Sequence, residues 1–190
     1  MTNPGLNFLA LAMYLATGTL LALYLMRGQT VTGGVKIGIF SLGTGAVALH
    51  AALLYAVVWT GAGLNLALTP AFSLVAWVVA SLYLITSLIR PVDNLGVLIL
   101  PIAGITVLIE WLWPGQMSLP LTSSVSAAHI IVSVLAYSLL CLAAVQSLML
   151  LMQERHLRAR QPGGFIRALP PMQTMEIVMF QMIGFGFILL

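Results

Sequence analysis

Long apolar runs, separated by short polar connections, are the feature that most restricts what this chain can fold into. Of its 190 residues, 61% are hydrophobic and only 6% are charged, whereas a soluble domain carries about a quarter charged residues. A helix of about 20 apolar residues crosses the hydrocarbon layer of a bilayer, which is roughly 30 Å thick. The sequence therefore predicts an integral membrane protein.

Six of these runs have the composition expected of membrane-crossing helices. We predict an all-α polytopic membrane protein with a single transmembrane domain over residues 1–190, folded as a helical bundle of about six transmembrane helices. Because the last run holds about fifteen residues, too few to span a bilayer, we expect an incomplete final helix and a truncated chain. The predicted helices cover about 4–26, 37–60, 66–89, 95–113, 123–152 and 176–190, with a cytoplasmic basic loop over 153–175.

The basic residues fall on alternate connections between the predicted helices. The first, third and fifth connections carry all seven, which are Arg27, Lys36, Arg90, Arg155, Arg158, Arg160 and Arg167. The positive-inside rule makes that side cytoplasmic, so we expect the amino terminus to lie outside. The net charge of +3 is explained by this orientation signal and does not indicate a nucleic-acid partner.

Sequence motifs exclude several functional classes. The chain has no C-x-x-C-H motif, so it is not itself a c-type cytochrome, and it has no zinc-ligand spacing, P-loop or dinucleotide-binding glycine motif. Its one cysteine, Cys141, lies inside an apolar run, so no disulfide framework exists. The sequence assigns no catalytic residue.

Two histidines lie inside predicted membrane helices, where a group that needs hydrogen bonds or a metal is costly to place. Counted from the predicted outer helix ends at 1.5 Å per residue, His50 lies about 15 Å deep and His129 about 9 Å deep. Because these depths are comparable, we predict His50 and His129 as ligands of one metal or one haem. The alternative is that each histidine only hydrogen-bonds between helices.

The neighbours of each histidine on its helix indicate which way it faces. Ser126, His129, Ser133 and Tyr137 recur at spacings of three and four residues, so they share one stripe of the fifth helix. We predict that the hydroxyls of Ser133 and Tyr137 contribute to cofactor binding, by holding the imidazole tautomer or a propionate. On the second helix, small residues on the histidine's face leave room for a close helix or a flat ligand; these are Gly43 and Ala46.

Three other polar residues are given ordinary roles. His156 lies in the basic loop and is expected to be solvated or to face lipid headgroups. Glu110, beside two tryptophans, is expected at the rim of the membrane, with a haem-edge or substrate contact as the alternative. Asp93 is expected to form a solvated pair with Arg90.

Two carboxy-terminal stretches carry a resemblance to a known family. Residues 128–158 read A-H-I-I-V-S-V-L-A-Y-S-L-L-C-L-A-A-V-Q-S-L-M-L-L-M-Q-E-R-H-L-R, and residues 169–190 read L-P-P-M-Q-T-M-E-I-V-M-F-Q-M-I-G-F-G-F-I-L-L. Both resemble the cytochrome c assembly protein family of the CcsA, CcmC and HemX type. The A-L-H-A-A-L-L-Y segment around His50 resembles the second helix of the YpjD inner-membrane branch, the closest branch. The W-W-D motif and second outer histidine of the synthase-type members are not present.

The resemblance implies a multi-pass protein of the bacterial inner (plasma) membrane that handles haem, of b type, in cytochrome c biogenesis. It implies that His129 takes the position of an outer-side histidine and His50 that of an intramembrane one, in haem delivery or retention. The implied partners are the lipid bilayer and other membrane or cytochrome assembly proteins.

A second hypothesis is a non-haem membrane scaffold or transport-accessory subunit whose histidines only pack helices. A proton-coupled transporter is the weakest alternative, because the sequence shows no inverted repeat and no acid at mid-depth in the membrane.

Overall fold

Six helices that are long and apolar enough to cross a membrane dominate the structure, which is a computed structural model. It describes residues 3–29, 31, 33–60, 63–90, 92–119, 124–159 and 169–190. The helices are α1 (Pro4–Met26), α2 (Gly33–Val58), α3 (Leu68–Ile89), α4 (Gly96–Leu112), α5 (Ser124–Arg158) and α6 (Met172–Leu189), with a 3-10 turn, η1 (Asp93–Leu95), before α4. The predicted all-α polytopic membrane fold is confirmed.

The first helix shows how local sequence sets an element's start. The Asn3 side chain accepts a hydrogen bond from the backbone N–H of Gly5 at 3.0 Å, and Pro4 occupies the first helical position. An asparagine cap followed by proline is a favoured helix start, because proline lacks only an N–H that would have no helical partner there. At the other end, Gly28 adopts a positive φ of 67° just after Met26.

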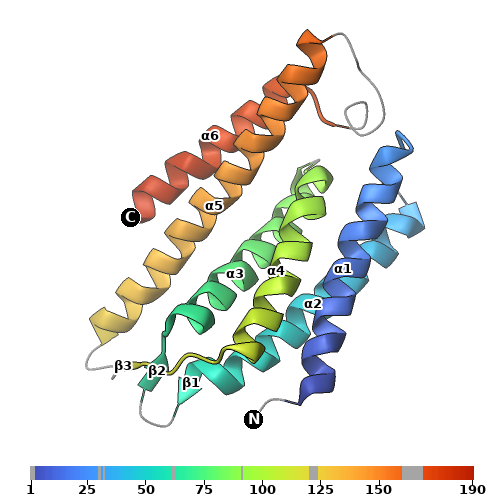
Figure 1. The fold of residues 1–190 in the computed structure, drawn as a ribbon. Coiled ribbons are helices and arrows are strands. Elements are labelled where there is room, and N and C mark those ends of the chain that lie inside the picture. Colours follow the sequence, from blue (N-terminus) through green and yellow to red (C-terminus); the bar gives the residue numbers. More distant parts are fainter. Residues whose placement is uncertain are drawn as a thin grey trace.

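The helices form a four-helix unit with a hairpin packed against it. In the unit, α1 packs against α2 and α4, and α3 packs against α2 and α4; α5 and α6 pair with each other, and α5 also packs against α3. Figure 1 shows the α5–α6 hairpin on one side of α3 and α4, with α1 and α2 on the other side. The hairpin therefore reaches the rest of the molecule mainly through α3.

The two ends of the molecule differ in structure. Helices α1, α3 and α5 each end toward the top of Figure 1, and three short strands lie at the bottom. These strands, β1 (Trp59–Thr60), β2 (Gly63–Asn65) and β3 (Ser118–Leu119), form an antiparallel sheet in the order β1-β2-β3. We call the two ends the basic end and the strand end, since the described basic residues of the connections belong to the first.

The strand end joins two connections that the sequence treats as separate. Strand β2 pairs with β1 and with β3, and the Asn65 side chain donates to the carbonyl oxygen of Gly115 at 2.9 Å and accepts from the N–H of Met117 at 2.9 Å. Between β1 and β2, residues 61 and 62 lie outside the described residues. The β pairing ties the α2–α3 connection to the α4–α5 connection.

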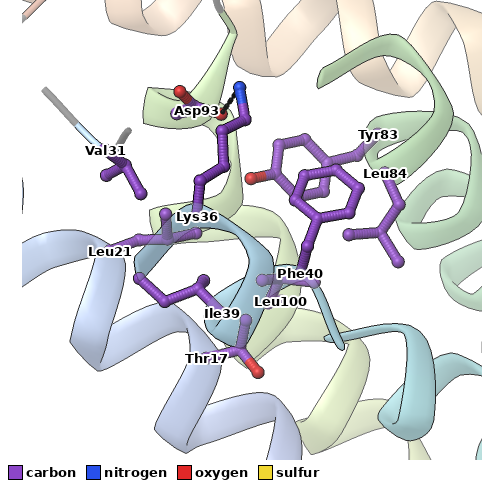
Figure 2. Close-up of a pocket in the computed structure, with 10 residues that line it drawn as sticks. All are labelled: Thr17, Leu21, Val31, Lys36, Ile39, Phe40, Tyr83, Leu84, Asp93 and Leu100. Carbon is purple, nitrogen blue, oxygen red and sulfur yellow. Dashed lines mark ion pairs between the residues drawn. The ribbon is translucent and has the colours of Figure 1, made fainter. Parts of the chain in front are cut away.

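At the basic end, a half-buried cluster of charged and polar side chains joins α2, α3 and η1. The Nζ atom of Lys36 lies 3.6 Å from Oδ1 of Asp93 and donates to the Ser87 carbonyl oxygen at 3.3 Å, and the Ser87 hydroxyl donates to Oδ1 of Asp93 at 2.7 Å. Figure 2 shows this pair at the mouth of a small cavity, with the Tyr83 hydroxyl directed into it. The expected solvated pair of Asp93 with Arg90 is replaced by the pair with Lys36, because η1 turns Asp93 toward the start of α2.

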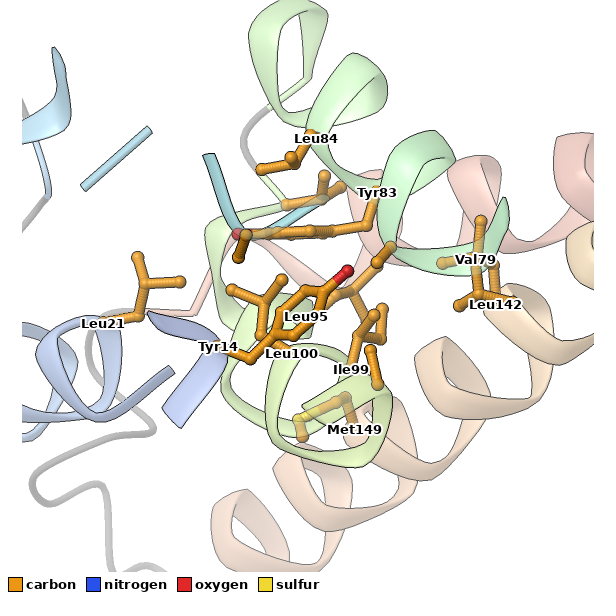
Figure 3. Close-up of a cluster of buried hydrophobic side chains, with 14 of the residues drawn as sticks. Tyr14, Leu21, Val79, Tyr83, Leu84, Leu95, Ile99, Leu100, Leu142 and Met149 are labelled. Atoms are coloured by element: carbon orange, nitrogen blue, oxygen red, sulfur yellow. The ribbon is translucent and has the colours of Figure 1, made fainter. Parts of the chain in front are cut away.

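Close packing holds α1 against α4, where the two helices approach across small residues. A Cβ atom added at Gly18 would lie 2.8 Å from Cδ of Pro101, so only glycine allows this approach. The core between the helices is formed by aromatic and aliphatic side chains from all six helices and η1, including Tyr14, Val79, Tyr83, Leu95 and Leu100 (Figure 3). In a membrane this packing, together with hydrogen bonds, drives helix association, because lipid is as apolar as the core.

The helix bounds differ most from the predicted ones around the basic loop. Helix α5 continues past Met152 to Arg158, and α6 begins at Met172 rather than at 176. Hydropathy measures the apolar part of a helix, whereas a helix can extend into polar sequence; here Arg158 pairs with Glu154 one turn earlier, at 2.6 Å. Residues 160–168 of the predicted loop, with Arg160 and Arg167, lie outside the described residues.

The other bounds shift by fewer residues. Helix α2 begins at Gly33 instead of 37 and ends at Val58, because Trp59 and Thr60 form β1. Helix α3 begins at Leu68 instead of 66, and α4 spans Gly96–Leu112 instead of 95–113.

Candidate functional site

His50 lies on the buried face of α2, where both of its ring nitrogens have hydroxyl partners. Its side chain is 1% exposed. The Tyr14 hydroxyl lies 3.1 Å from Nδ1, and the Ser73 hydroxyl lies 3.0 Å from Nε2. Tyr14 comes from α1 and Ser73 from α3, so the three side chains, which we call the polar clasp, join three helices.

The small residues beside His50 have neighbours from two other helices. A Cβ atom added at Gly43 would lie 3.3 Å from side-chain atoms of both Thr17 and Leu84. Ala46 is fully buried. The sequence left open whether this face of α2 meets a close helix or a flat ligand. In the structure, α1 and α3 pack closely against it.

A further hydrogen bond closes the same interface. The indole N–H of Trp77 on α3 donates to the Val47 carbonyl oxygen on α2 at 2.9 Å. The ring of Tyr14 meets the His50 imidazole edge to face, with centroids 5.7 Å apart and an interplanar angle of 89°. His50 is therefore held by hydrogen bonds, by a ring contact and by the packing of its two neighbouring helices.

His129 has the opposite environment. It is exposed on the first turns of α5, and no residue from Val125 to Leu135 is buried. Among the described residues, its imidazole makes no hydrogen bond, ion pair or ring contact. One ring nitrogen of a neutral His129 therefore carries an accessible lone pair.

The predicted stripe of α5 remains on one side of the helix. We call Ser126, His129, Ser133 and Tyr137 the His129 stripe; Ser133 is half-buried and Tyr137 is 54% exposed. Two apolar residues on the same turns are also exposed, Val125 by 76% and Ile131 by 60%. The stripe therefore presents one imidazole and three hydroxyls on α5, with the exposed Val125 one turn before His129.

The two histidines lie on helices with different principal neighbours. Helix α2 packs against α1 and α3, whereas α5 packs against α6 and α3. Both histidines lie in the half of their helix nearer the strand end, since α2 runs toward that end and α5 starts from it. His50 faces the interior of the four-helix unit, whereas His129 is on the surface of the hairpin.

The remaining candidate residues have ordinary environments. Glu110 lies in the last turn of α4 and is only 4% exposed, so its side chain is buried within the bundle, while the neighbouring Trp111 contacts Phe8 of α1. His156 is exposed, with Nδ1 2.8 Å from the Met152 carbonyl oxygen. Within the described residues, no group of three or more histidine, cysteine and acidic side chains could hold a metal ion.

The sequence missed the two partners of His50. Tyr14 and Ser73 stand 36 and 23 residues away along the chain. Each is one of several polar residues in its apolar run, so no signal along the chain marks it as a partner of His50. Pairing them with His50 required the helix packing.

Comparisons with known proteins place most of the chain within one family model. The family model described as "Cytochrome C assembly protein" matches residues 43–190, a range that includes His50, Ser73 and all of α5 and excludes α1. The chain is also 43% identical over 56 residues to an uncharacterized 28.8 kDa protein in a nifR3-like 5' region of Azospirillum brasilense. That match covers 30% of this chain and 21% of the relative's length. No solved structure matches the chain.

Proposed function

We propose that this chain, which belongs to the cytochrome c assembly protein family, takes part in the biogenesis of c-type cytochromes by holding haem at the membrane. The observation that carries the proposal is the His129 stripe, an accessible imidazole beside hydroxyls on an apolar helix surface. Intramembrane histidines are expensive and are retained for a function. The proposal includes haem retention or delivery and no catalytic step.

The residues of the stripe fit a haem of b type. Haem supplies an iron that takes a neutral imidazole as an axial ligand, and His129 offers such a nitrogen without first losing a protein partner. The hydroxyls of Ser133 and Tyr137, one and two turns further along α5, are donors for a propionate. The exposed side chain of Val125, one turn before His129, offers apolar surface for the macrocycle.

His50 was predicted as a second iron ligand, and it fits that role less well than His129. Both of its nitrogens already have a hydroxyl partner at about hydrogen-bond distance, 3.1 Å and 3.0 Å. An iron bond at His50 would require one of these hydroxyls to leave. The haem proposal therefore rests on His129.

We place the protein in the bacterial inner membrane, with the basic end on the cytoplasmic side. The described basic residues of the α1–α2, α3–α4 and α5–α6 connections support this orientation, as the positive-inside rule requires. The amino terminus and the start of α5 then lie near the outer surface, where apocytochromes would be reached. Lipid and other cytochrome assembly proteins are the proposed partners.

A haem titration of the detergent-purified protein tests the proposal. Wild-type protein should develop a Soret band with sharp reduced bands, and His129→Ala should not. His156→Ala is the matched control, because His156 lies on the same helix, is exposed and is remote from the stripe. A wild-type protein that binds no haem would overturn the haem proposal.

The polar clasp favours a second candidate function, a non-haem membrane scaffold whose histidines pack helices. His50 already behaves in that way in the structure, with hydroxyls from α1 and α3 on its two nitrogens. This candidate predicts that neither His129→Ala nor His50→Ala changes the visible spectrum. A Soret band that depends on His129 would exclude it.

A further inference from the structure

We propose that Tyr14, His50 and Ser73 form a structural clasp, separate from the haem site, which fixes α1, α2 and α3 relative to one another. In this proposal His50 is a positioning residue and not an iron ligand. The statement about helix packing stands on the structure alone; the statement about iron rests on the proposed function.

The hydrogen-bond inventory of an imidazole supports the clasp. A neutral imidazole has one N–H donor and one acceptor nitrogen, whereas a hydroxyl can act in either direction. The two hydroxyls at 3.1 Å from Nδ1 and 3.0 Å from Nε2 therefore satisfy both nitrogens in either tautomer. The ring retains no free lone pair for a metal.

Ser73 differs from several other described helix hydroxyls in a way that points to His50. The hydroxyls of Thr17, Ser81 and Ser138 each donate to the carbonyl oxygen four residues earlier. A short hydroxyl side chain in a helix commonly makes this local bond. The Ser73 hydroxyl instead contacts the imidazole of a neighbouring helix.

Burial makes the clasp costly to open. Tyr14 and Ser73 are fully buried, and His50 is 1% exposed. A ligand that displaced either hydroxyl from His50 would leave a buried polar group without a partner. Such a group destabilises the fold by its full desolvation penalty. The Trp77 bond to Val47 and the close contacts at Gly43 hold the same interface shut.

The clasp also connects to the region that carries His129. Its third member, Ser73, belongs to α3, and α3 is the element of the four-helix unit that contacts α5. By fixing α3 against α1 and α2, the clasp provides a rigid support for the hairpin. It contributes no atom to the His129 stripe.

Four variants of the full chain in detergent test the clasp, read by thermal unfolding and by haem titration together. Tyr14→Phe and Ser73→Ala each remove one hydroxyl and should lower Tm by about 2–4 °C, the shift that follows a loss of about 1 kcal/mol in a chain of this size. His50→Leu removes both bonds and should lower Tm further. Combining Tyr14→Phe with His50→Leu should add little, since the two share one bond.

His50→Gln separates the clasp from an iron ligand. A glutamine amide keeps one donor group and one acceptor, so it should restore part of the Tm lost in His50→Leu, and the Soret band should be unchanged. If His50→Gln remains folded but loses or shifts the Soret band, His50 binds iron and the proposal is wrong.

The thermal measurements stand apart from haem. If no variant, including wild type, binds haem, the proposed function fails while the Tm values still decide the clasp. Unchanged Tm values in Tyr14→Phe, Ser73→Ala and His50→Leu would overturn it.

Discussion

The surroundings of the two membrane histidines show how differently one residue type is used in this molecule. His50 is enclosed by three helices, and each ring nitrogen has a hydroxyl partner. His129 is exposed on a part of α5 that has no buried residue, and its ring has no partner among the described residues. The partners of the ring nitrogens distinguish the two histidines, and the proposed haem ligand is the one whose ring has no partner among the described residues.

The comparison also separates two parts of the fold. The four-helix unit is closely packed, with Gly18 against Pro101 and a core of large side chains. The first turns of α5 extend from that packing with their side chains exposed. The haem site proposed at His129 would use this uncovered surface.

The largest effect is expected from His129→Ala, which removes the accessible imidazole of the stripe. Haem binding, followed as the Soret band on titration, should be lost, because no other described residue on that face offers a neutral nitrogen ligand. His156→Ala should bind haem as wild type does. If His129→Ala and His156→Ala bound haem equally well, His129 would not be the ligand.

A smaller effect, on stability instead of spectrum, is expected from His50→Leu. Loss of the imidazole leaves the buried hydroxyls of Tyr14 and Ser73 without their partner. Each unsatisfied group in a water-excluded site costs about 1–3 kcal/mol. The cost between membrane helices is smaller, because a hydrogen bond there contributes only about 0.6 kcal/mol on average. We expect a net loss of about 1–3 kcal/mol, measured by denaturant or thermal unfolding in detergent. A His50→Leu protein as stable as wild type would contradict the clasp.

Smaller still are the effects of the two hydroxyls in the stripe. Ser133→Ala and Tyr137→Phe each remove one donor to a propionate. A net hydrogen bond of about 0.5–1.5 kcal/mol corresponds to roughly a 2–10-fold weaker Kd for haem. Cys141→Ala, one turn beyond Tyr137 on the exposed side of α5, is the matched control and should leave Kd unchanged. Identical affinities in all three variants would limit the site to His129.

The smallest effect is expected at the basic end. Lys36→Met removes the cation of the pair with Asp93, whose side chains are 33% and 20% exposed. Partly exposed pairs contribute about 0.2–1 kcal/mol, so unfolding should shift slightly and haem binding should not change. A double-mutant cycle with Asp93→Asn measures the pair directly. A change in the Soret band would show that the two ends of the molecule are coupled.

The six helices were predictable because each membrane-crossing helix corresponds to a long apolar run in the sequence. The extension of α5 to Arg158 was missed, since hydropathy stops at the first polar residues while an ion pair between Glu154 and Arg158 continues the helix. The β pairing at the strand end was missed as well, because strands of two or three residues carry too little pattern to detect.

The candidate site was predictable where it depends on one helix and not where it depends on several. The stripe through His129 follows from helical spacing alone. The partners of His50 and of Asp93 come from other helices, which the sequence does not reveal. For Asp93 the sequence suggested its neighbour along the chain, Arg90, whereas its partner in the structure is Lys36. The burial of Glu110 likewise depends on which helices pack together.

The most direct test of the account is a haem titration of the purified protein, with the Soret absorbance of wild type and His129→Ala recorded at equal protein concentration. We predict a saturable band for wild type and no saturable band for a folded His129→Ala protein. A folded His129→Ala protein that binds haem as tightly as wild type would contradict the assignment of haem to α5.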